Sequence, residues 1–158
     1  PLYIDDTPQI TVMQIRQKLR RISVSDALPA MVVIDYLQLM GGGDGESRQL
    51  VVAEISRGLK MLSREFEIPV VALSQLSRGI EQRQDRRPVL SDLRESGALE
   101  QDADVVMFLY REEAANAEAG LNDRGTAEVL VQKHRSGPTG NLSLLFNKAY
   151  TQFVDDPE

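Results

Sequence analysis

Apolar residues along the chain follow two kinds of pattern, short continuous runs and longer segments with helical spacing. Runs at residues 31–34, 70–73 and 105–109 predict strands, and β-branched residues in the first favour a strand buried on both faces, as in a parallel sheet. Residues 12–22 and 47–66 carry apolar side chains three or four positions apart, which predicts amphipathic helices. This alternation indicates an α/β domain with parallel central strands.

Other segments show different signals. Leu2–Ile4 predicts a short strand, and Thr11–Gln14 has the spacing of a capping box that begins the first helix. The glycine-rich stretch 41–45 predicts a mobile loop, and the polar stretch 77–88 a further loop. Alternating apolar residues within 127–146, interrupted by a Gly-Pro-Thr-Gly turn, predict a C-terminal antiparallel hairpin.

Composition narrows the possible functions. Hydrophobic residues make up 42% and charged residues 27% of the 158 residues, as in ordinary globular domains. The chain has no cysteine and one histidine, which excludes disulfides and metal sites built from several Cys or His. No run approaches the roughly 20 apolar residues that span a bilayer, so we expect a cytoplasmic protein without membrane contact. The net charge of −6 argues against a generally basic surface but permits a local phosphate contact.

Asp35 directly follows the apolar run 31–34. The carboxyl ends of parallel strands open on the crevice where α/β proteins bind ligands, and Mg²⁺ is usually held by one or two carboxylates with phosphates and water. Asp35 is therefore a candidate magnesium ligand. The alternative is an aspartate that simply ends a core strand.

Ser74 and Gln75 follow the next run in the same way. Their polar groups suit a bond to a γ-phosphate or to an attacking water. The alternative is a strand-to-turn junction whose side chains satisfy local backbone groups.

Lys133 and Arg135 lie two positions apart near the hairpin turn. In an extended segment their side chains share one face about 6.5 Å apart, while His134 points to the other. Clustered cations favour an anion such as a phosphate from a neighbouring subunit. The alternative is a solvated hairpin end with a structural His134.

Arg94 and Gly97 offer a cation and a small residue whose N–H can approach a phosphate closely. No aromatic residue lies nearby, which favours contact with a nucleic-acid backbone rather than base stacking. The alternative pairs Arg94 with Glu95 or Asp92 on a surface turn.

Four strings occur in order along the chain, and together they resemble the C-terminal, RecA-like motor of bacterial DnaB helicases. They are Val33-Ile-Asp-Tyr-Leu-Gln-Leu-Met40, Pro69-Val-Val-Ala-Leu-Ser-Gln-Leu76, Asp92-Leu-Arg-Glu-Ser-Gly97 continued by Glu100-Gln-Asp-Ala-Asp104, and Lys133-His-Arg-Ser-Gly-Pro-Thr-Gly140. The resemblance extends from about Leu2 to Val154. It implies a RecA-like P-loop NTPase core that uses ATP and Mg²⁺.

The resemblance also implies roles for individual residues. Asp35 is similar to the Walker B magnesium ligand of the family, and Gln75 to its γ-phosphate sensor. Arg135 resembles the arginine finger that enters the ATP site of a neighbouring subunit, with Lys133 as its companion. These matches imply that Gln75, Lys133 and Arg135 contact nucleotide and act in hydrolysis.

The same resemblance implies a hexameric ring that unwinds duplex DNA at the replication fork while it moves along single-stranded DNA. Arg94, Glu95 and Gly97 look like the loop that contacts the single strand. Residues 41–48 correspond to a second channel-facing loop. A primase and a helicase loader are the partners that the family implies.

The chain also departs from the family pattern. It contains no Gly-x-x-x-x-Gly-Lys-Ser/Thr phosphate loop. We therefore expect residues 1–158 to be the C-terminal part of one ATPase domain, without its Walker A segment, catalytic glutamate, linker and N-terminal domain. Two alternatives remain, namely another RecA-like ATPase of recombinase or clock type, and a non-catalytic α/β interaction domain.

The missing phosphate loop generates a prediction for the isolated chain. We expect it neither to bind ATP tightly nor to unwind DNA, because the residues that cradle the phosphates are absent. Equilibrium titration with a fluorescent ATP analogue and a strand-displacement assay measure both properties. Robust ATP turnover by the isolated chain would contradict the expectation.

Overall fold

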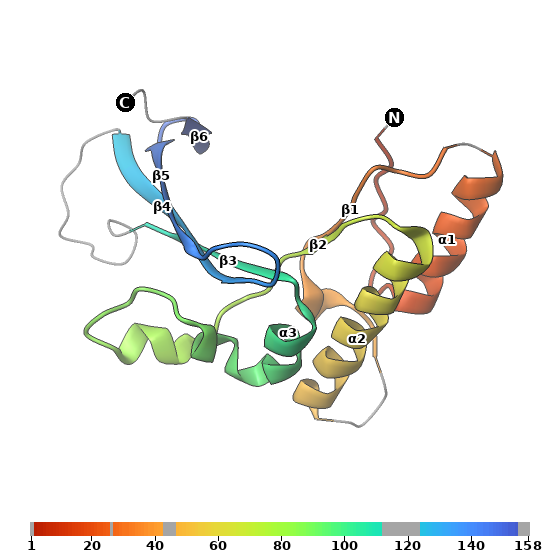
Figure 1. Ribbon diagram of the computed structural model, residues 1–158, viewed down its shortest axis with the longest axis horizontal. Helices are drawn as coiled ribbons and strands as arrows, with labels where there is room; N and C mark the ends of the chain where they lie inside the picture. The colour runs from red at the N-terminus through yellow and green to blue at the C-terminus, as the bar shows by residue number, and fades with distance from the viewer. Residues whose placement is uncertain (1, 26, 43–46, 112–123, 155–158) are drawn as a thin grey trace. The chain divides into compact units, whose positions relative to one another are not determined.

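The computed structural model describes residues 2–25, 27–42, 47–111 and 124–154, with the backbone alone for residues 94–96 and 124. The chain divides into two compact units. The first comprises Pro1–Leu76 and Leu93–Ala103, and the second comprises Ser77–Asp92 and Asp104–Glu158. Each unit has its own sheet, parallel in the first and antiparallel in the second (Figure 1).

The first unit combines helices with the parallel strand pair. Its elements are α1 (Val12–Ser25), β1 (Val32–Ile34), the 3-10 helix η1 (Leu37–Leu39), α2 (Arg48–Phe66), β2 (Val70–Ala72) and α3 (Gly97–Asp102). The 3-10 helix η3 (Leu90–Ser96) runs from the second unit into the first. Val32 pairs with Val70 and Ile34 with Ala72 in parallel register. The predicted strands at 31–34 and 70–73 are confirmed as a parallel pair, and the two long helices are confirmed. The predicted strand at 105–109 is also present, but it pairs antiparallel in the separate sheet of the second unit.

The predicted capping box begins α1. The Thr11 N–H donates to Gln14 Oε1 at 2.8 Å, and the Gln14 N–H donates to Thr11 Oγ1 at 3.3 Å. These bonds satisfy donors that the first helical turn leaves without partners. The predicted apolar stripe faces inward, with Ile15 and Leu19 buried.

Helix α2 supplies most of the core of the first unit. Its apolar positions recur on one side, and Leu62 is fully buried. Glu67 caps the helix, and its N–H donates to the Ser63 carbonyl. The left-handed backbone of Glu67 (φ 55°) turns the chain so that the Ile68 N–H also donates to the Ser63 carbonyl, at 3.2 Å. The core cluster consists of Ile15, Leu19, Ile34, Leu37, Met40, Val51, Ile55, Leu59, Leu62 and Ile68.

The predicted strand at Leu2–Ile4 is wrong. These residues are in no strand, and the side chains of Leu2 and Ile4 are each 84% exposed. A strand needs a neighbouring strand whose backbone satisfies its N–H and C=O groups. No strand in the described part of the chain extends its sheet to this segment, so apolar composition alone did not make it a strand.

The prediction that residues 31–34 are buried on both faces is also wrong. Ile34 is 8% exposed, whereas Val33, which points to the opposite face, is 56% exposed. In β2, Val71 is exposed as well. The described part of the first unit covers only one face of this sheet, mainly with α2.

The first two residues of the glycine-rich stretch, Gly41 and Gly42, are in no helix or strand and lie very close to other parts of the chain. A Cβ at Gly41 would lie 2.3 Å from the Gln9 carbonyl oxygen, and one at Gly42 would lie 2.2 Å from Val51 Cγ1. The Gly41 N–H also donates to the Ile10 carbonyl at 3.1 Å. Glycine is needed here for close approach, and residues 43–46 lie outside the described residues.

The second unit is built on a four-stranded antiparallel sheet with the order β3-β4-β5-β6. Its strands are β3 (Val105–Tyr110), β4 (Arg124–His134), β5 (Gly140–Asn147) and β6 (Gln152–Val154), preceded by the 3-10 helix η2 (Arg78–Gln82). The predicted C-terminal hairpin is confirmed as β4 and β5, with Val131 opposite Gly140. Leu130 and Phe146 lie in its buried interior. No helix in the described part of the chain is long and apolar enough to cross a membrane.

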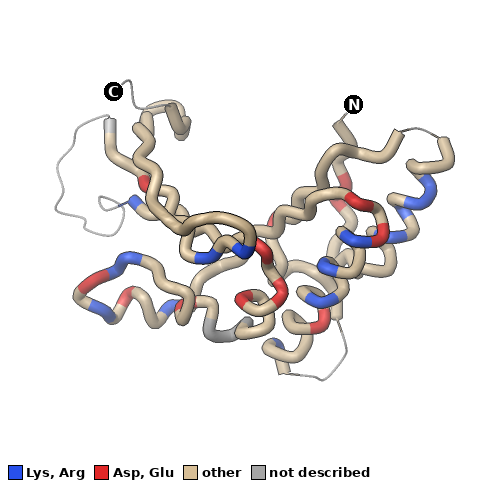
Figure 2. Tube along the Cα trace, in the orientation of Figure 1, with Lys and Arg blue, Asp and Glu red and all other residues tan. Residues whose placement is uncertain are grey.

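Charged side chains connect α1 to its surroundings within the first unit. Lys and Arg are frequent along this helix (Figure 2). Lys18 pairs with Asp5, and Arg20 pairs with Glu65 near the end of α2 at 2.7 Å. The Lys18 ammonium and two bonds from Thr7 lower the pKa of Asp5 from its ordinary 3.8 to about 2.

Replacement Lys18→Met is expected to return the Asp5 pKa toward 3.8, because it removes the largest cause of the shift. The native Asp5 pKa is lowered, so its stabilising contribution is present above pH 3.8 and is lost as the pH falls toward 2. The variant should lose most of this pH dependence. NMR titration of the Asp5 carboxyl carbon measures the pKa, with the exposed Arg21→Met variant as control. An unchanged Asp5 pKa in Lys18→Met would contradict the assignment.

Candidate functional site

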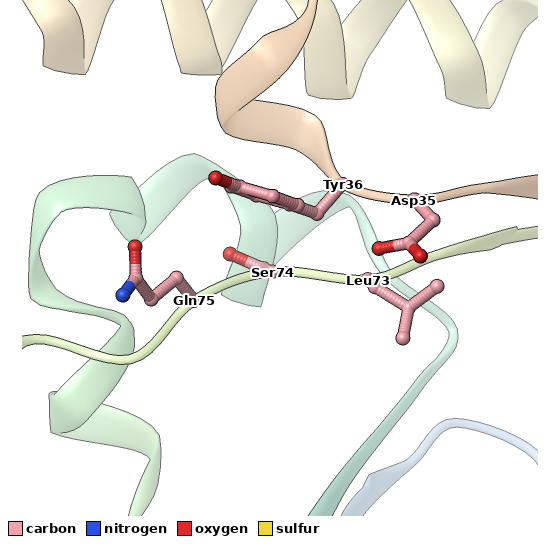
Figure 3. Close-up of a pocket in the computed structure, with 5 residues that line it drawn as sticks. All are labelled: Asp35, Tyr36, Leu73, Ser74 and Gln75. Carbon is pink, nitrogen blue, oxygen red and sulfur yellow. The ribbon is translucent and has the colours of Figure 1, made fainter. Parts of the chain in front are cut away.

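The ends of β1 and β2 form an open cavity of about 340 Å³ in the first unit. It is lined by Asp35, Tyr36, Leu73, Ser74 and Gln75. In Figure 3, the Asp35 carboxylate is directed toward the segment that continues β2, from which Ser74 and Gln75 project. The structure therefore brings together Asp35 and Gln75, which the sequence analysis identified on separate strings.

Backbone hydrogen bonds explain why these residues meet. The Leu73 N–H donates to the Ile34 carbonyl, and the Leu37 N–H donates to the Leu73 carbonyl, both at 2.9 Å. The parallel pairing thus continues past the ends of the strands. As a result, the first polar residue after β1 and those after β2 reach the same edge.

Gln38 is a site residue that the sequence analysis did not single out. Its Nε2 donates to Ser74 Oγ at 3.0 Å and to the Gln75 carbonyl at 3.4 Å, and its Oε1 accepts from the Gln75 N–H at 3.3 Å. The Gln38 carbonyl accepts from Arg48 at the start of α2. The available signal was a polar residue three positions after Asp35 in an otherwise apolar segment.

Three side chains at the cavity could bind a ligand: the Asp35 carboxylate, the Ser74 hydroxyl and the Gln75 carboxamide. A carboxylate, a hydroxyl and a carboxamide suit Mg²⁺ and phosphate better than a softer metal. Within the described ranges, no group of three or more His, Cys, Asp or Glu is arranged to hold a metal by itself. A single carboxylate fits Mg²⁺, which usually takes one or two carboxylates and completes its shell with phosphates and water.

The predicted cationic pair lies in the second unit. Lys133 is half-buried near the end of β4, and Arg135 follows directly after the strand. Lys133 pairs with the buried Val106 and His134 with the exposed Val105, so Lys133 and His134 point to opposite faces of the sheet.

Arg135 already has an ion-pair partner. Its Nη1 lies 3.3 Å from Asp104 Oδ1, and its N–H donates to the Asp104 carbonyl at 2.9 Å. The Arg135 side chain is nevertheless 45% exposed. An exposed pair of this kind is worth about 0–1 kcal/mol, so exchanging Asp104 for a phosphate costs little.

His134 has a structural role in the hairpin turn, as the alternative interpretation expected. Its Nδ1 lies 3.2 Å from the Pro138 carbonyl oxygen. A Cβ at Gly137 would come too close to the imidazole ring, so a side chain at that position would displace His134.

The predicted nucleic-acid contact lies on helical turns, which the sequence analysis did not anticipate. Arg94 and Glu95 belong to η3, and Gly97 is the first residue of α3. The side chains of Arg94 and Glu95 lie outside the described part of the chain. A Cβ at Gly97 would meet none of the described atoms within 4 Å, so no packing within the described chain requires glycine there.

Asp92 is a buried anchor for the preceding segment of the second unit. Its Oδ2 accepts from Arg83 Nη2 at 2.7 Å and from the Val89 N–H at 2.8 Å. Arg87 pairs with Glu128 of β4 and lies over the Tyr110 ring. Figure 2 shows cations and carboxylates interspersed between η2 and η3. The partner of Asp92 is therefore Arg83, and the sequence analysis had considered only Arg94.

A parallel strand pair with a carboxylate and an amide at one edge is the arrangement of nucleotide triphosphatases with an α/β core. A family model described as the DnaB-like helicase C terminal domain matches residues 1–155. The chain belongs to this family. The match confirms the resemblance found in the sequence, and the fold class is that of a RecA-like ATPase core.

Individual relatives agree with the family match. The chain is 53% identical over 156 residues to the replicative DNA helicase DnaB of Geobacillus stearothermophilus, and 51% identical over 156 residues to the replicative DNA helicase DnaC of Bacillus subtilis (strain 168). Each alignment covers 98% of this chain and 34% of the relative. The chain thus spans about a third of the length of these curated relatives.

Solved structures give the same assignment. One structure, described as the ATPase domain of another protein, has a TM-score of 0.85 and 46% identity, and the match covers 93% of this chain and 52% of that one. A DnaB-like replicative helicase described with its interactions with primase has a TM-score of 0.84 and 46% identity, and that match covers 93% of this chain and 36% of the other.

Proposed function

We propose that this chain is the C-terminal part of the ATPase domain of a replicative DNA helicase. In the complete protein, ATP hydrolysis drives a homo-hexameric ring along single-stranded DNA and unwinds the duplex ahead of it. The observation that carries the proposal is the shared cavity of Asp35 and Gln75 at the ends of two paired parallel strands. Membership of the DnaB-like family supports it.

The proposed domain boundary is consistent with the extent of the matches. The chain corresponds to 52% of a solved ATPase domain and to about a third of the curated helicases. We therefore place the phosphate-binding loop and the general base in residues outside this segment of a longer protein, together with a linker and an N-terminal domain.

Asp35 is the proposed magnesium ligand. Its carboxylate lies at the cavity, over the segment that continues β2 beside Leu73 (Figure 3), so a cation held there would lie within the same site as a bound triphosphate. The cation would neutralise charge on the phosphate oxygens during phosphoryl transfer. Among the residues of this chain, Asp35 binds and orients the cation.

Gln75 is the proposed sensor of the γ-phosphate. Its carboxamide can donate to a phosphate oxygen and can orient an attacking water. Its main chain is held by Gln38, so the side chain starts from a defined position at the cavity. Loss of the γ-phosphate after hydrolysis would remove the partner of this amide.

Arg135 and Lys133 are proposed to act on the nucleotide of the neighbouring subunit. A guanidinium stabilises the charge that develops on the transferred phosphoryl group. Arg135 is exposed enough to exchange Asp104 for an external phosphate. This role explains why the complete protein would act as a ring, since each site takes residues from two subunits.

Arg94, Glu95 and Gly97 are proposed to contact single-stranded DNA. Gly97 is exposed and is not required by packing within the described chain, which suits a close approach to an external phosphate. The absence of aromatic residues between Leu90 and Asp104 favours contact with the backbone over base stacking.

The family also supports proposals for partners and location. One structural relative is described with its interactions with primase, and we propose primase and a helicase loader as partners of the complete protein. We propose a cytoplasmic location, where a replicative helicase has access to the chromosome.

Arg135→Ala in the complete ring is expected to lower ATP turnover by at least about a hundred-fold, because the transferred phosphoryl group loses its external cation. Nucleotide binding should change little, since Arg135 contributes mainly to the transition state. Steady-state turnover and equilibrium nucleotide titration separate the two effects.

The neighbouring Ser136→Ala provides a matched control at the same exposed turn. It should retain turnover within about two-fold, because a surface substitution of this kind has a small effect. Full turnover in Arg135→Ala would exclude the proposed finger.

A further inference from the structure

Where β1 ends, the side chain of Gln38 makes the hydrogen bonds to the neighbouring segment that a strand backbone would otherwise make. Backbone pairing continues as far as the bond from the Leu37 N–H to the Leu73 carbonyl. The chain then turns into η1, so no β1 backbone faces the next position of the neighbouring segment. That position is Gln75, and its N–H and C=O both bond to the Gln38 carboxamide.

A primary carboxamide is suited to this substitution. Like a peptide group, it presents one acceptor oxygen and donor N–H groups, and here it uses both kinds on the same residue. Its second donor bond reaches Ser74 Oγ at 3.0 Å. Leucine would provide neither group, and glutamate would provide only acceptors.

Gln38 is itself held in place. The preceding residue, Leu37, is 1% exposed and belongs to the core. The Met40 N–H donates to the Leu37 carbonyl at 3.1 Å, which closes the short helix. On the other side, Arg48 donates to the Gln38 carbonyl. The carboxamide therefore projects from a fixed backbone.

We propose that Gln38 is a positioning residue that fixes the main chain of Gln75 and thereby aims the Gln75 side chain at the γ-phosphate. This inference rests on the proposed function for the role of Gln75, whereas the positioning itself rests on the hydrogen bonds alone. Gln38 is not among the residues that line the cavity. It acts through Gln75, because a small displacement of a catalytic group can lower a rate by as much as about a hundred-fold.

The first test measures positioning without activity. Amide hydrogen exchange of the complete protein is followed by mass spectrometry with residue-resolving fragmentation in Gln38→Leu, in Gln38→Glu and in Leu39→Ala, a control at an exposed neighbouring position. In Gln38→Leu, exchange at the Gln75 N–H should rise at least about five-fold, while exchange at Leu73, which bonds to Ile34, stays unchanged. Gln38→Glu keeps an acceptor and should show a smaller rise. Equal exchange at Gln75 in wild type and Gln38→Leu would overturn the inference.

The second test uses the complete helicase. Gln38→Leu should lower DNA-stimulated kcat by about ten-fold with KM for ATP within about two-fold, and Gln38→Glu should lie between it and wild type. In a double-mutant cycle, Gln38→Leu should add no further loss to Gln75→Ala, because both changes remove the same aimed side chain. Additive losses would indicate a merely structural role and would overturn the inference.

The two tests separate the two proposals. A complete wild-type protein without DNA-stimulated ATP turnover would contradict the proposed function. The exchange measurement would still decide whether Gln38 fixes Gln75. A change in Gln75 exchange combined with additive kinetic losses would show that Gln38 holds the backbone but does not aim the sensor, which rejects the inference as stated.

Discussion

The parallel pairing of β1 with β2 is the constraint on which the proposed site depends. Pairing of Ile34 with Ala72 fixes the relative position of the two strand ends, and a shift by one residue would exchange the faces of every side chain. α2 packs its apolar side against this pair and buries Ile34 in the core. Hydrophobic burial in the first unit therefore sets the register that brings Asp35 and Gln75 to one cavity.

Charge in this protein is arranged as local pairs rather than as a uniform field. The chain carries a net charge of −6, and two arginines of the second unit are paired with carboxylates. Arg135 pairs with Asp104 at the surface, and Arg83 pairs with the buried Asp92. The exposed pair can be exchanged for a phosphate at small cost, whereas breaking the buried pair leaves an uncompensated charge. Arg135 therefore suits a transient contact, and Arg83 suits a permanent one.

Sequence patterns predicted the elements that depend on local signals. The capping box at Thr11, the helical period of α2 and the alternating hairpin strands were all found, since each is encoded within one segment. The Asp35 and Gln75 site was predicted because strand ends that share an edge can be inferred from chain order. Contacts between segments that are distant in the sequence were harder to predict from sequence patterns. The exposure of Val33 depends on what covers the second face of the sheet, and the role of Gln38 depends on the exact point where β1 turns away.

Two other features also depend on contacts between segments that are distant in the sequence. Composition alone did not show that Gln9 and Val51 approach Gly41 and Gly42 too closely to leave space for a side chain. The helical turns from Leu90 to Asp102 lack a strong apolar period, and their most buried anchor, Asp92, is polar. Tertiary packing decides both cases, so local propensity was a poor guide.

The central claim is that one ATP site combines Asp35 of one subunit with Arg135 of its neighbour. Mixing complete Asp35→Ala subunits with complete Arg135→Ala subunits tests it directly, with ATP turnover as the measurement. Each variant alone should have almost no ATP turnover. In an equal random mixture, about a quarter of the subunit interfaces should combine an intact Asp35 with an intact Arg135, and these interfaces should hydrolyse ATP. A mixture as inactive as its separate components would contradict the shared site.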